Sequence, residues 1–161
     1  MLNKAYLPCY EGCLVCGSPE VNPHTLNRKF EVSDDGVQCS FCAGEEHIGY
    51  KGVVHGGIIC ALLDETIGWA VAVERRKFFV TGELTVRFVR PLPVGLTVTV
   101  RGRAVEHKSK YSVAEGKIID DAGVIYAKAS GKFFLMKDED AERVNAYLSY
   151  DKNDLNVLEV Q

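Results

Sequence analysis

Residues 49–73 read GYKGVVHGGIICALLDETIGWAVAV, and this stretch decides the fold. Its first part is a glycine-rich turn that ends in His55-Gly56-Gly57, and the remainder predicts a helix over about residues 56–73. Apolar side chains occur nearly all round this helix, which is typical of a helix buried inside a protein. Asp64 and Glu65 interrupt the apolar run. A carboxylate on a buried helix costs free energy unless another group pairs with it or uses it, so this pair is a candidate functional site.

The spacing of His55 and Asp64 indicates a site shared between two chains. The two residues are nine positions apart, and at about 3.6 residues per turn they point to opposite sides of the helix. A two-fold dimer could place Asp64 of one protomer beside His55 of the other, and the symmetry would do so twice. The exposed N–H groups at the helix start, near Gly57, are predicted to form a site for developing negative charge.

The motif His55-Gly56-Gly57, followed by Asp64 and by the segment Arg90-Pro91-Leu92-Pro93-Val94-Gly95, resembles the PaaI-like (phenylacetate-pathway type) acyl-CoA thioesterases. The resemblance covers roughly the last two thirds of the chain, with a weaker N-terminal match in Cys13-x-x-Cys16-Gly17 and Asn22-Pro23. It implies an α+β hotdog fold, in which a curved antiparallel sheet wraps a long apolar helix. It also implies a homodimer that joins the two sheets and shares its active sites, with a dimer of dimers as the alternative.

The resemblance implies a catalytic role for four residues. Asp64 would act as general base or nucleophile, and the backbone N–H of Gly57 would bind the oxyanion. His55 would orient the thioester, and the Thr81 hydroxyl would hold the attacking water. Each residue also has a purely structural explanation: a paired carboxylate, a helix start, a loop histidine or a strand threonine chosen for β-propensity.

Substrate contacts are expected from a second set of residues around the same motif. Related proteins carry an Asn or Gln about six positions before the motif histidine, and this chain has none there; His47 and Tyr50 are the side chains that could replace it. Several basic side chains could contact the CoA phosphates, but their positions are equally well explained as the solvent-exposed face of a strand. The predicted substrate-binding residues are Gly56, Tyr50, Lys51, Glu65 and Arg90, and further cations are Arg87, Lys108 and Lys110.

Composition indicates an ordinary globular protein. The chain has 161 residues, of which 47% are apolar and 25% charged, and this length predicts one domain over residues 1–161. The net charge of −3 argues against a nucleic-acid partner. Residues 1–12 lack the apolar segment of a signal peptide, and the run from Ile58 to Val73 is expected to be too short to span a membrane. A cytoplasmic protein is therefore predicted.

Six segments with strand-like alternation surround the helix. Two precede it and flank the turn Asp34-Asp35-Gly36, and four follow it. In the first segment after the helix, Leu84, Val86 and Phe88 are predicted to face the core. The core is expected over residues 26–136, after a lead-in over residues 1–25, and a helix with a tail follows over residues 137–161. The predicted strands are 26–33, 37–42, 78–90, 96–104, 111–119 and 124–136.

Six cysteines are the unusual feature of the composition. Two CxxC pairs, Cys13 with Cys16 and Cys39 with Cys42, could in principle form a four-thiolate zinc site. However, Cys39 and Cys42 fall in a strand, where residues three apart face opposite ways. Reduced cysteines in a reducing compartment explain the composition without a metal, so no metal or cofactor is expected.

Thioester hydrolysis of an acyl-CoA is thus the predicted function, and three alternatives stay open. The first is a hotdog protein that binds acyl-CoA without cleaving it, against which the intact Asp64 argues. The second is a dehydratase or hydratase acting on acyl thioesters, whose local motifs do not occur in this chain. The third is a zinc-stabilised interaction module that uses both CxxC pairs. The acyl chain that the enzyme prefers is not predictable from the sequence.

Overall fold

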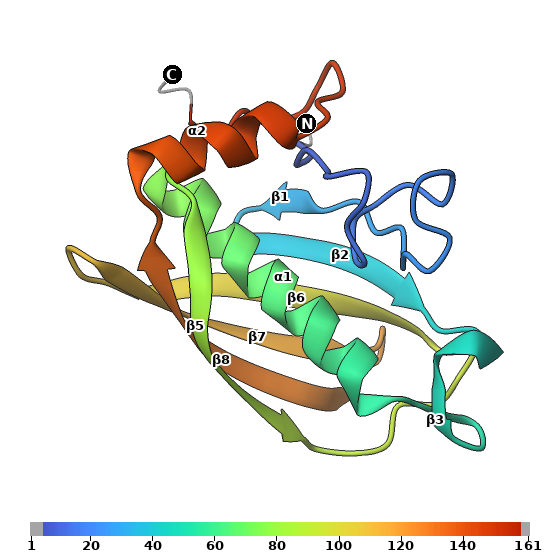
Figure 1. The fold of residues 1–161 in the computed structure, drawn as a ribbon. Coiled ribbons are helices and arrows are strands. Elements are labelled where there is room, and N and C mark those ends of the chain that lie inside the picture. Colours follow the sequence, from blue (N-terminus) through green and yellow to red (C-terminus); the bar gives the residue numbers. More distant parts are fainter. Residues whose placement is uncertain (1–4, 159–161) are drawn as a thin grey trace.

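The computed structural model describes residues 5–158, and one long helix, α1 (Gly56–Arg75), lies in the hollow of a curved sheet (Figure 1). A short helix, α2 (Asp138–Tyr147), lies near the C-terminal end of α1. Before α1 come a 3₁₀ turn (Glu45–His47) and a two-stranded hairpin, β3 (Ile48–Tyr50) with β4 (Val53–Val54). The strands of the large sheet are β1 (Glu31–Ser33), β2 (Gly36–Cys42), β5 (Phe79–Phe88), β6 (Thr97–His107), β7 (Tyr111–Ile119) and β8 (Ile125–Leu135).

The large sheet is antiparallel throughout and has the order β1-β2-β6-β7-β8-β5. The strand that directly follows α1, β5, therefore lies at one edge. Five of the strands contact α1, and the helix buries Leu62, Leu63 and Ile67 completely. A sheet that curls round one apolar helix confirms the predicted α+β hotdog fold.

Three glycines allow α1 to approach the sheet closely. Gly102, Gly116 and Gly131 lie on the adjacent strands β6, β7 and β8. A Cβ atom at Gly116 would lie 2.5 Å from Ile67 Cγ2, and one at Gly102 would lie 2.9 Å from the Thr66 carbonyl oxygen. Because neither distance leaves room for a methyl group, these glycines set the separation between the helix and the sheet.

The predicted strands agree with the observed ones in position, with three differences. Residues 26–30 are not a strand, so β1 begins only at Glu31. The glycine-rich segment before α1, expected to be a turn, contains the β3–β4 hairpin and is preceded by the 3₁₀ turn. Phe88 does not face the core: its side chain is 53% exposed. The reason is the position of β5 at the sheet edge, where only Phe79, Leu84 and Val86 are half-buried.

The two ends of the described chain lie side by side. The backbone of Tyr6 forms bridges with Glu31 and Asp154, and Cys9 pairs with Ser149. The tail therefore docks through residue 158, and the side chain of Val157 is fully buried. Residues 1–4 and 159–161 of the predicted lead-in and tail lie outside the described residues.

By length and composition alone, α1 could cross a membrane. The helix is longer than the predicted apolar run from Ile58 to Val73, because it begins at Gly56 and continues to Arg75, so that it has 20 residues. Half of the most apolar 18-residue stretch of α1 is nevertheless buried inside the fold. This burial is what the core helix of a curved sheet requires.

Candidate active site

His55 begins α1 as its N-cap residue. Its Nδ1 atom accepts a hydrogen bond of 2.9 Å from the backbone N–H of Gly57. Both residues are exposed, so the helix start is open to a ligand. The N–H predicted to bind an oxyanion is therefore engaged by the imidazole in this structure. An oxyanion could use that N–H only after the His55 ring turns away.

The structure brings Asp64 and Thr81 together. Thr81, on β5, donates a hydrogen bond of 2.9 Å from Oγ1 to Oδ1 of Asp64, on the third turn of α1. Asp64 is half-buried and Thr81 is exposed. Within residues 5–158, Asp64 makes no hydrogen bond to His55, in agreement with the prediction that the two point to opposite sides of the helix.

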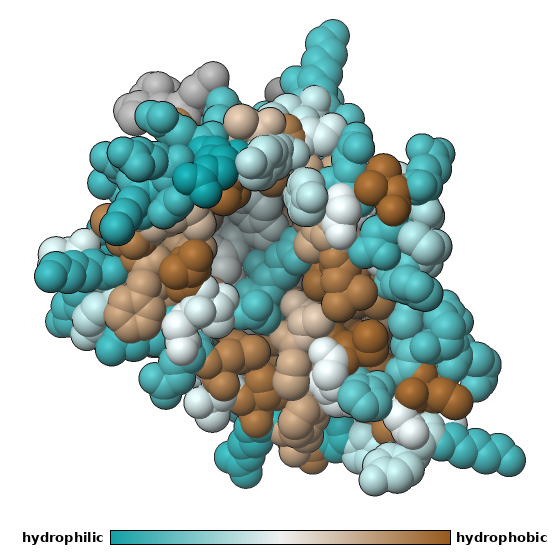
Figure 2. All heavy atoms as spheres, in the orientation of Figure 1, coloured by the Kyte–Doolittle hydropathy of each residue, from teal (hydrophilic) through white to brown (hydrophobic). Residues whose placement is uncertain are grey.

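Asp64 and Thr81 line a pocket of about 290 Å³ on the face of the molecule that carries α1. Figure 2 shows this face hollowed, with apolar side chains gathered beside the hollow. Most of the pocket wall is apolar or aromatic, as a site for an acyl group requires. The other lining residues are Tyr10, Cys13, Cys16, Glu65, Gly68, Trp69, Ala72, Phe78, Phe79, Phe133, Val144 and Leu148.

A larger concavity of about 920 Å³ lies on the outer face of the sheet. Its lining includes Arg87, Arg101, Lys117 and Lys128, and it contains none of the four predicted catalytic residues. It is the charged outer surface of a twisted sheet. Arg87, one of the predicted CoA-binding cations, therefore lies away from the Asp64 pocket.

Glu65 faces the N-terminal segment. It is half-buried, and its Oε2 atom is hydrogen-bonded to Sγ of Cys13 at 3.2 Å. Burial, reinforced by the charge on Cys13, raises the pKa of Glu65 to about 8. The Cys16 thiol and the backbone amides of Cys16 and Val15 donate to the Cys13 sulfur and lower the pKa of Cys13 to about 5. Burial therefore favours the protonated form of Glu65, and the donors around the sulfur favour the thiolate of Cys13.

The two CxxC pairs do not converge. Cys39 is buried and Cys42 is exposed, because they lie on opposite faces of β2, as the sequence predicts. Burial raises the pKa of Cys39 to about 12, so this thiol stays protonated. Among residues 5–158, only Cys13, Cys16 and Glu65 form a group that could hold a metal ion. This group is not predictable from the sequence, since Glu65 is 49 positions from Cys16.

The remaining predicted substrate-binding residues lie near the start of α1 or on exposed loops. Gly56 lies against the Phe88 ring, which a Cβ atom would approach to 3.3 Å. The side chain of Tyr50, on β3, is 84% exposed. Lys51 and Arg90 are also exposed, in the hairpin turn and just after β5. None of these residues lines the Asp64 pocket.

A second arrangement of serine, histidine and acid lies at the other end of α1. His107 Nδ1 is 3.0 Å from Ser112 Oγ, and its Nε2 is 2.7 Å from Glu74 Oε1. Arg75 also donates to Ser112 Oγ at 3.2 Å. Ser112 is fully buried, so no substrate can reach its hydroxyl. This network therefore joins the end of α1 to β6 and β7.

Comparison with known proteins identifies the family. A sequence model of the thioesterase superfamily matches residues 51–128, which include the His55 motif, Asp64 and Thr81. A protein from Sulfurisphaera tokodaii named "Putative esterase" is 30% identical, and the match covers 70% of this chain and 85% of the length of that protein. One of the same name from Saccharolobus solfataricus is 34% identical over 58% of this chain and 66% of its own. An acyl-coenzyme A thioesterase of Mus musculus is 29% identical over 69% of this chain. The present chain spans only 45% of the mouse protein.

Solved structures share the fold. A thioesterase superfamily protein aligns with a TM-score of 0.71 and 26% identity, over 77% of this chain and 60% of its own. A Bacillus halodurans protein solved with CoA aligns with a TM-score of 0.56 and 29% identity, over 62% of this chain and 66% of its own. These matches confirm the thioesterase superfamily and, at that level, the class of thioester hydrolases, whereas the PaaI-like type stays a prediction. The chain belongs to the thioesterase superfamily.

Proposed function

We propose that this protein hydrolyses an acyl-CoA to the free acid and CoA. The observation that carries the proposal is the hydrogen-bonded pair of Asp64 and Thr81 in the wall of a largely apolar pocket. A carboxylate held by a hydroxyl can accept a proton from a water or attack a carbonyl carbon, and the apolar wall suits an acyl group. The mouse relative is named an acyl-coenzyme A thioesterase, and the Bacillus halodurans structure contains CoA, which supports this substrate class.

The site is proposed to be complete only in a homodimer. The edge strand β5 carries Thr81, and the chain exposes Val80 and Phe88 on the same strand by 50% and 53%. A long edge strand with exposed apolar side chains favours pairing with another strand. Two-fold pairing of β5 with its copy would bring a partner's helix start to Asp64, which its own chain does not do. Assembly into a dimer of dimers and cytoplasmic localisation stay predictions.

The chemistry can be written through the residues of this site. Asp64 takes a proton from a water that Thr81 helps to hold, and the water oxygen attacks the thioester carbonyl carbon. Negative charge develops on the carbonyl oxygen, where the partner's Gly57 N–H stabilises it once the His55 ring has moved. The C–S bond then breaks, and the CoA sulfur leaves as a thiolate that takes up a proton. In the alternative route Asp64 itself attacks, and water then hydrolyses the mixed anhydride.

The test is CoA release from aromatic, short-chain and medium-chain acyl-CoAs, followed with a thiol reagent against a blank without substrate. Asp64→Asn is expected to lower kcat by about 10²–10⁴-fold while the protein stays folded, since this is the typical contribution of a general base. Asp121→Asn, a change of the same kind at an exposed loop residue, is the control and should leave turnover unchanged. Near-normal turnover in Asp64→Asn would refute the mechanism. Label in the Asp64 carboxylate after a single turnover in ¹⁸O-water would establish the nucleophilic route, because general-base attack places all of the label in the released acid.

A further inference from the structure

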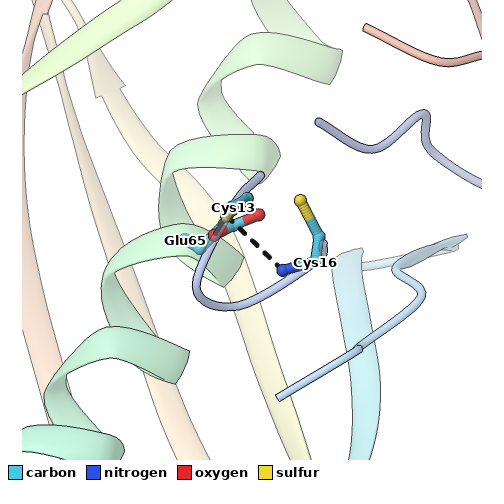
Figure 3. Close-up of side chains that lie close together, drawn as sticks. All are labelled: Cys13, Cys16 and Glu65. Atoms are coloured by element: carbon cyan, nitrogen blue, oxygen red, sulfur yellow. Dashed lines mark hydrogen bonds between the residues drawn. The ribbon is translucent and has the colours of Figure 1, made fainter. Parts of the chain in front are cut away.

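Cys13, Cys16 and Glu65 form the one group of potential metal ligands within residues 5–158 (Figure 3). Their ligand atoms all lie within 4.8 Å of one another. The two cysteines come from the N-terminal loop, and the glutamate comes from α1. In a tetrahedral zinc site with bonds of about 2.3 Å, two ligand atoms lie about 3.8 Å apart, so small side-chain movements would suffice to bind an ion.

The loop directs two backbone amides at the sulfur of Cys13. The backbone amides of Val15 and Cys16 donate to Cys13 Sγ at 3.3 and 3.5 Å. Amides directed at a sulfur stabilise the thiolate, which is the form that binds a metal. Gly17 closes the turn: a Cβ atom there would lie 2.2 Å from the Cys13 carbonyl oxygen, so only glycine fits.

The loop is also fixed from outside. Leu26 and Arg28 donate backbone hydrogen bonds to the carbonyls of Leu14 and Val15, at 2.7 and 2.8 Å. The Asn22 side chain donates to the carbonyl of Gly12 at 3.1 Å. The positions of both cysteines are therefore set by backbone contacts before any ion binds, which lowers the entropy cost of binding.

Cys13, Cys16 and Glu65 would together carry three negative charges when all three are deprotonated. Glu65 directs its carboxylate at the sulfur of Cys13, although both groups are anionic when deprotonated. No Lys, Arg or His lies among the residues that line this pocket. A divalent cation would balance two thiolates and a carboxylate to within one charge.

We propose that Cys13, Cys16 and Glu65 bind one zinc ion in the wall of the pocket. Two thiolates with one carboxylate are a donor set suited to zinc, because soft sulfur ligands disfavour magnesium and calcium and the carboxylate disfavours copper(I). All three residues line the pocket, so the fourth position of the tetrahedron is left for a water. The ion ties the N-terminal loop to α1. The ion would lie about 100° round α1 from Asp64, in the wall of the same pocket, and its binding does not depend on the proposed hydrolysis.

This assignment departs from the expectation of no metal. That expectation considered only a zinc site of four cysteines, and the second CxxC pair does fail to converge with the first. Glu65 supplies the third ligand in its place, which the folding of α1 against the loop makes possible. The site is thus built from one CxxC pair and a residue of the core helix.

The test is metal content followed by cobalt substitution. Protein purified under reducing conditions is expected to contain one zinc per chain by atomic emission. After chelation and addition of cobalt(II), the proposal predicts thiolate-to-cobalt charge-transfer absorption in the near ultraviolet and the intense visible bands of tetrahedral cobalt. Cys13→Ser and Cys16→Ser should abolish both signals, and Glu65→Gln should weaken cobalt binding. Cys42→Ser, in the exposed half of the other pair, is the matched control and should change neither.

Two results would overturn the assignment. Absence of zinc together with a cobalt spectrum lacking charge-transfer bands in the wild type would exclude a thiolate site. Loss of metal in Cys42→Ser as well would show a four-cysteine site in place of the proposed one. Because a Cys13 variant could fail to fold, far-ultraviolet circular dichroism is recorded for each variant, and the wild-type cobalt spectrum stands independently of all of them. CoA release is not a readout here, so the outcome is separable from that of the hydrolysis experiment.

Discussion

Asp64 and Glu65 are neighbours in the sequence, but the fold gives them opposite surroundings. They lie about 100° apart round α1. Asp64 faces the edge strand β5 and accepts a hydrogen bond from Thr81. Glu65 faces the N-terminal loop and is hydrogen-bonded to Cys13. Asp64 lies beside the edge strand that we propose pairs with a second chain, whereas Glu65 contacts the N-terminal loop of its own chain.

This difference indicates how one helix can serve two purposes. A carboxylate at an open edge can be completed by a partner and used for catalysis, while one that is covered by its own chain is available for a structural site. The comparison predicts that changes on the Asp64 side act through assembly and turnover. Changes on the Glu65 side should instead act through stability and metal content.

The strongest test of the Asp64 side uses hybrid dimers. Asp64→Asn and Gly57→Pro are expected to inactivate their own homodimers, because proline removes the N–H and is tolerated in the first turn of a helix. If each site uses both chains, a hybrid of these two variants has one intact site. We expect it to regain about half of the wild-type activity per dimer. The measurement is CoA release by hybrids purified through two different affinity tags.

The control is a hybrid of the wild type with the double variant. In a shared site this hybrid has no intact site and should be inactive. If each site were formed by a single chain, the results would be reversed: the double variant hybrid would be active and the hybrid of single variants would not. One pair of measurements therefore separates the two arrangements.

The edge strand itself gives the next largest effect. Val80→Lys places a charge on the exposed face of β5, where Val80 is 50% exposed, and is expected to convert the proposed dimer to a monomer with little turnover. Val105→Lys is the matched control, because Val105 is 42% exposed on β6 and away from that edge. Sedimentation measures the mass of each variant. A Val80→Lys protein that stays dimeric would place the interface elsewhere.

The sequence predicts the elements well wherever the pattern is local. The apolar run from Ile58, the turn at Asp34-Asp35-Gly36 and the strand 111–119 are all found in the structure. Phe88 was misplaced, because alternation shows which residues share a face but not that the strand lies at an edge. The role of Gly102, Gly116 and Gly131 was also missed, since glycines in strands carry no signal for a helix that packs across them.

The site was predictable only in part, for the same physical reason. The motif suggested Asp64 and Thr81, and the structure joins them by a hydrogen bond. Sequence alone did not show that His55 engages the Gly57 N–H, because that depends on a side-chain rotamer. Nor did it show that Glu65 meets Cys13, a contact across 52 positions that exists only after the lead-in folds against α1.

Thr81 is expected to have a smaller effect on turnover than Asp64. Thr81→Val removes the hydrogen bond to the Asp64 carboxylate and should lower kcat about 10-fold with KM little changed, since the bond joins a charged group at a partly exposed position. Thr85→Val, on the same strand but in the lining of the outer concavity, is the control. A rise in KM alone would instead assign Thr81 to substrate binding.

The smallest expected effect is a pH dependence of stability on the Glu65 side. In chelator-treated protein, the unfolded chain releases the Glu65 proton near pH 4.5, whereas the folded chain holds it to about pH 8. The folded state therefore binds more protons in this window, so raising the pH from about 4.5 to 8 lowers the free energy of unfolding. The lowered pKa of Cys13 acts in the opposite direction, so the contribution of Glu65 is isolated by comparison with Glu65→Gln. Urea unfolding across this range should show the wild type losing stability relative to the variant as the pH rises. Zinc should reverse that trend, since the ion binds the deprotonated ligands. A constant difference at every pH, with and without zinc, would mean that Glu65 is as open to water as Asp64.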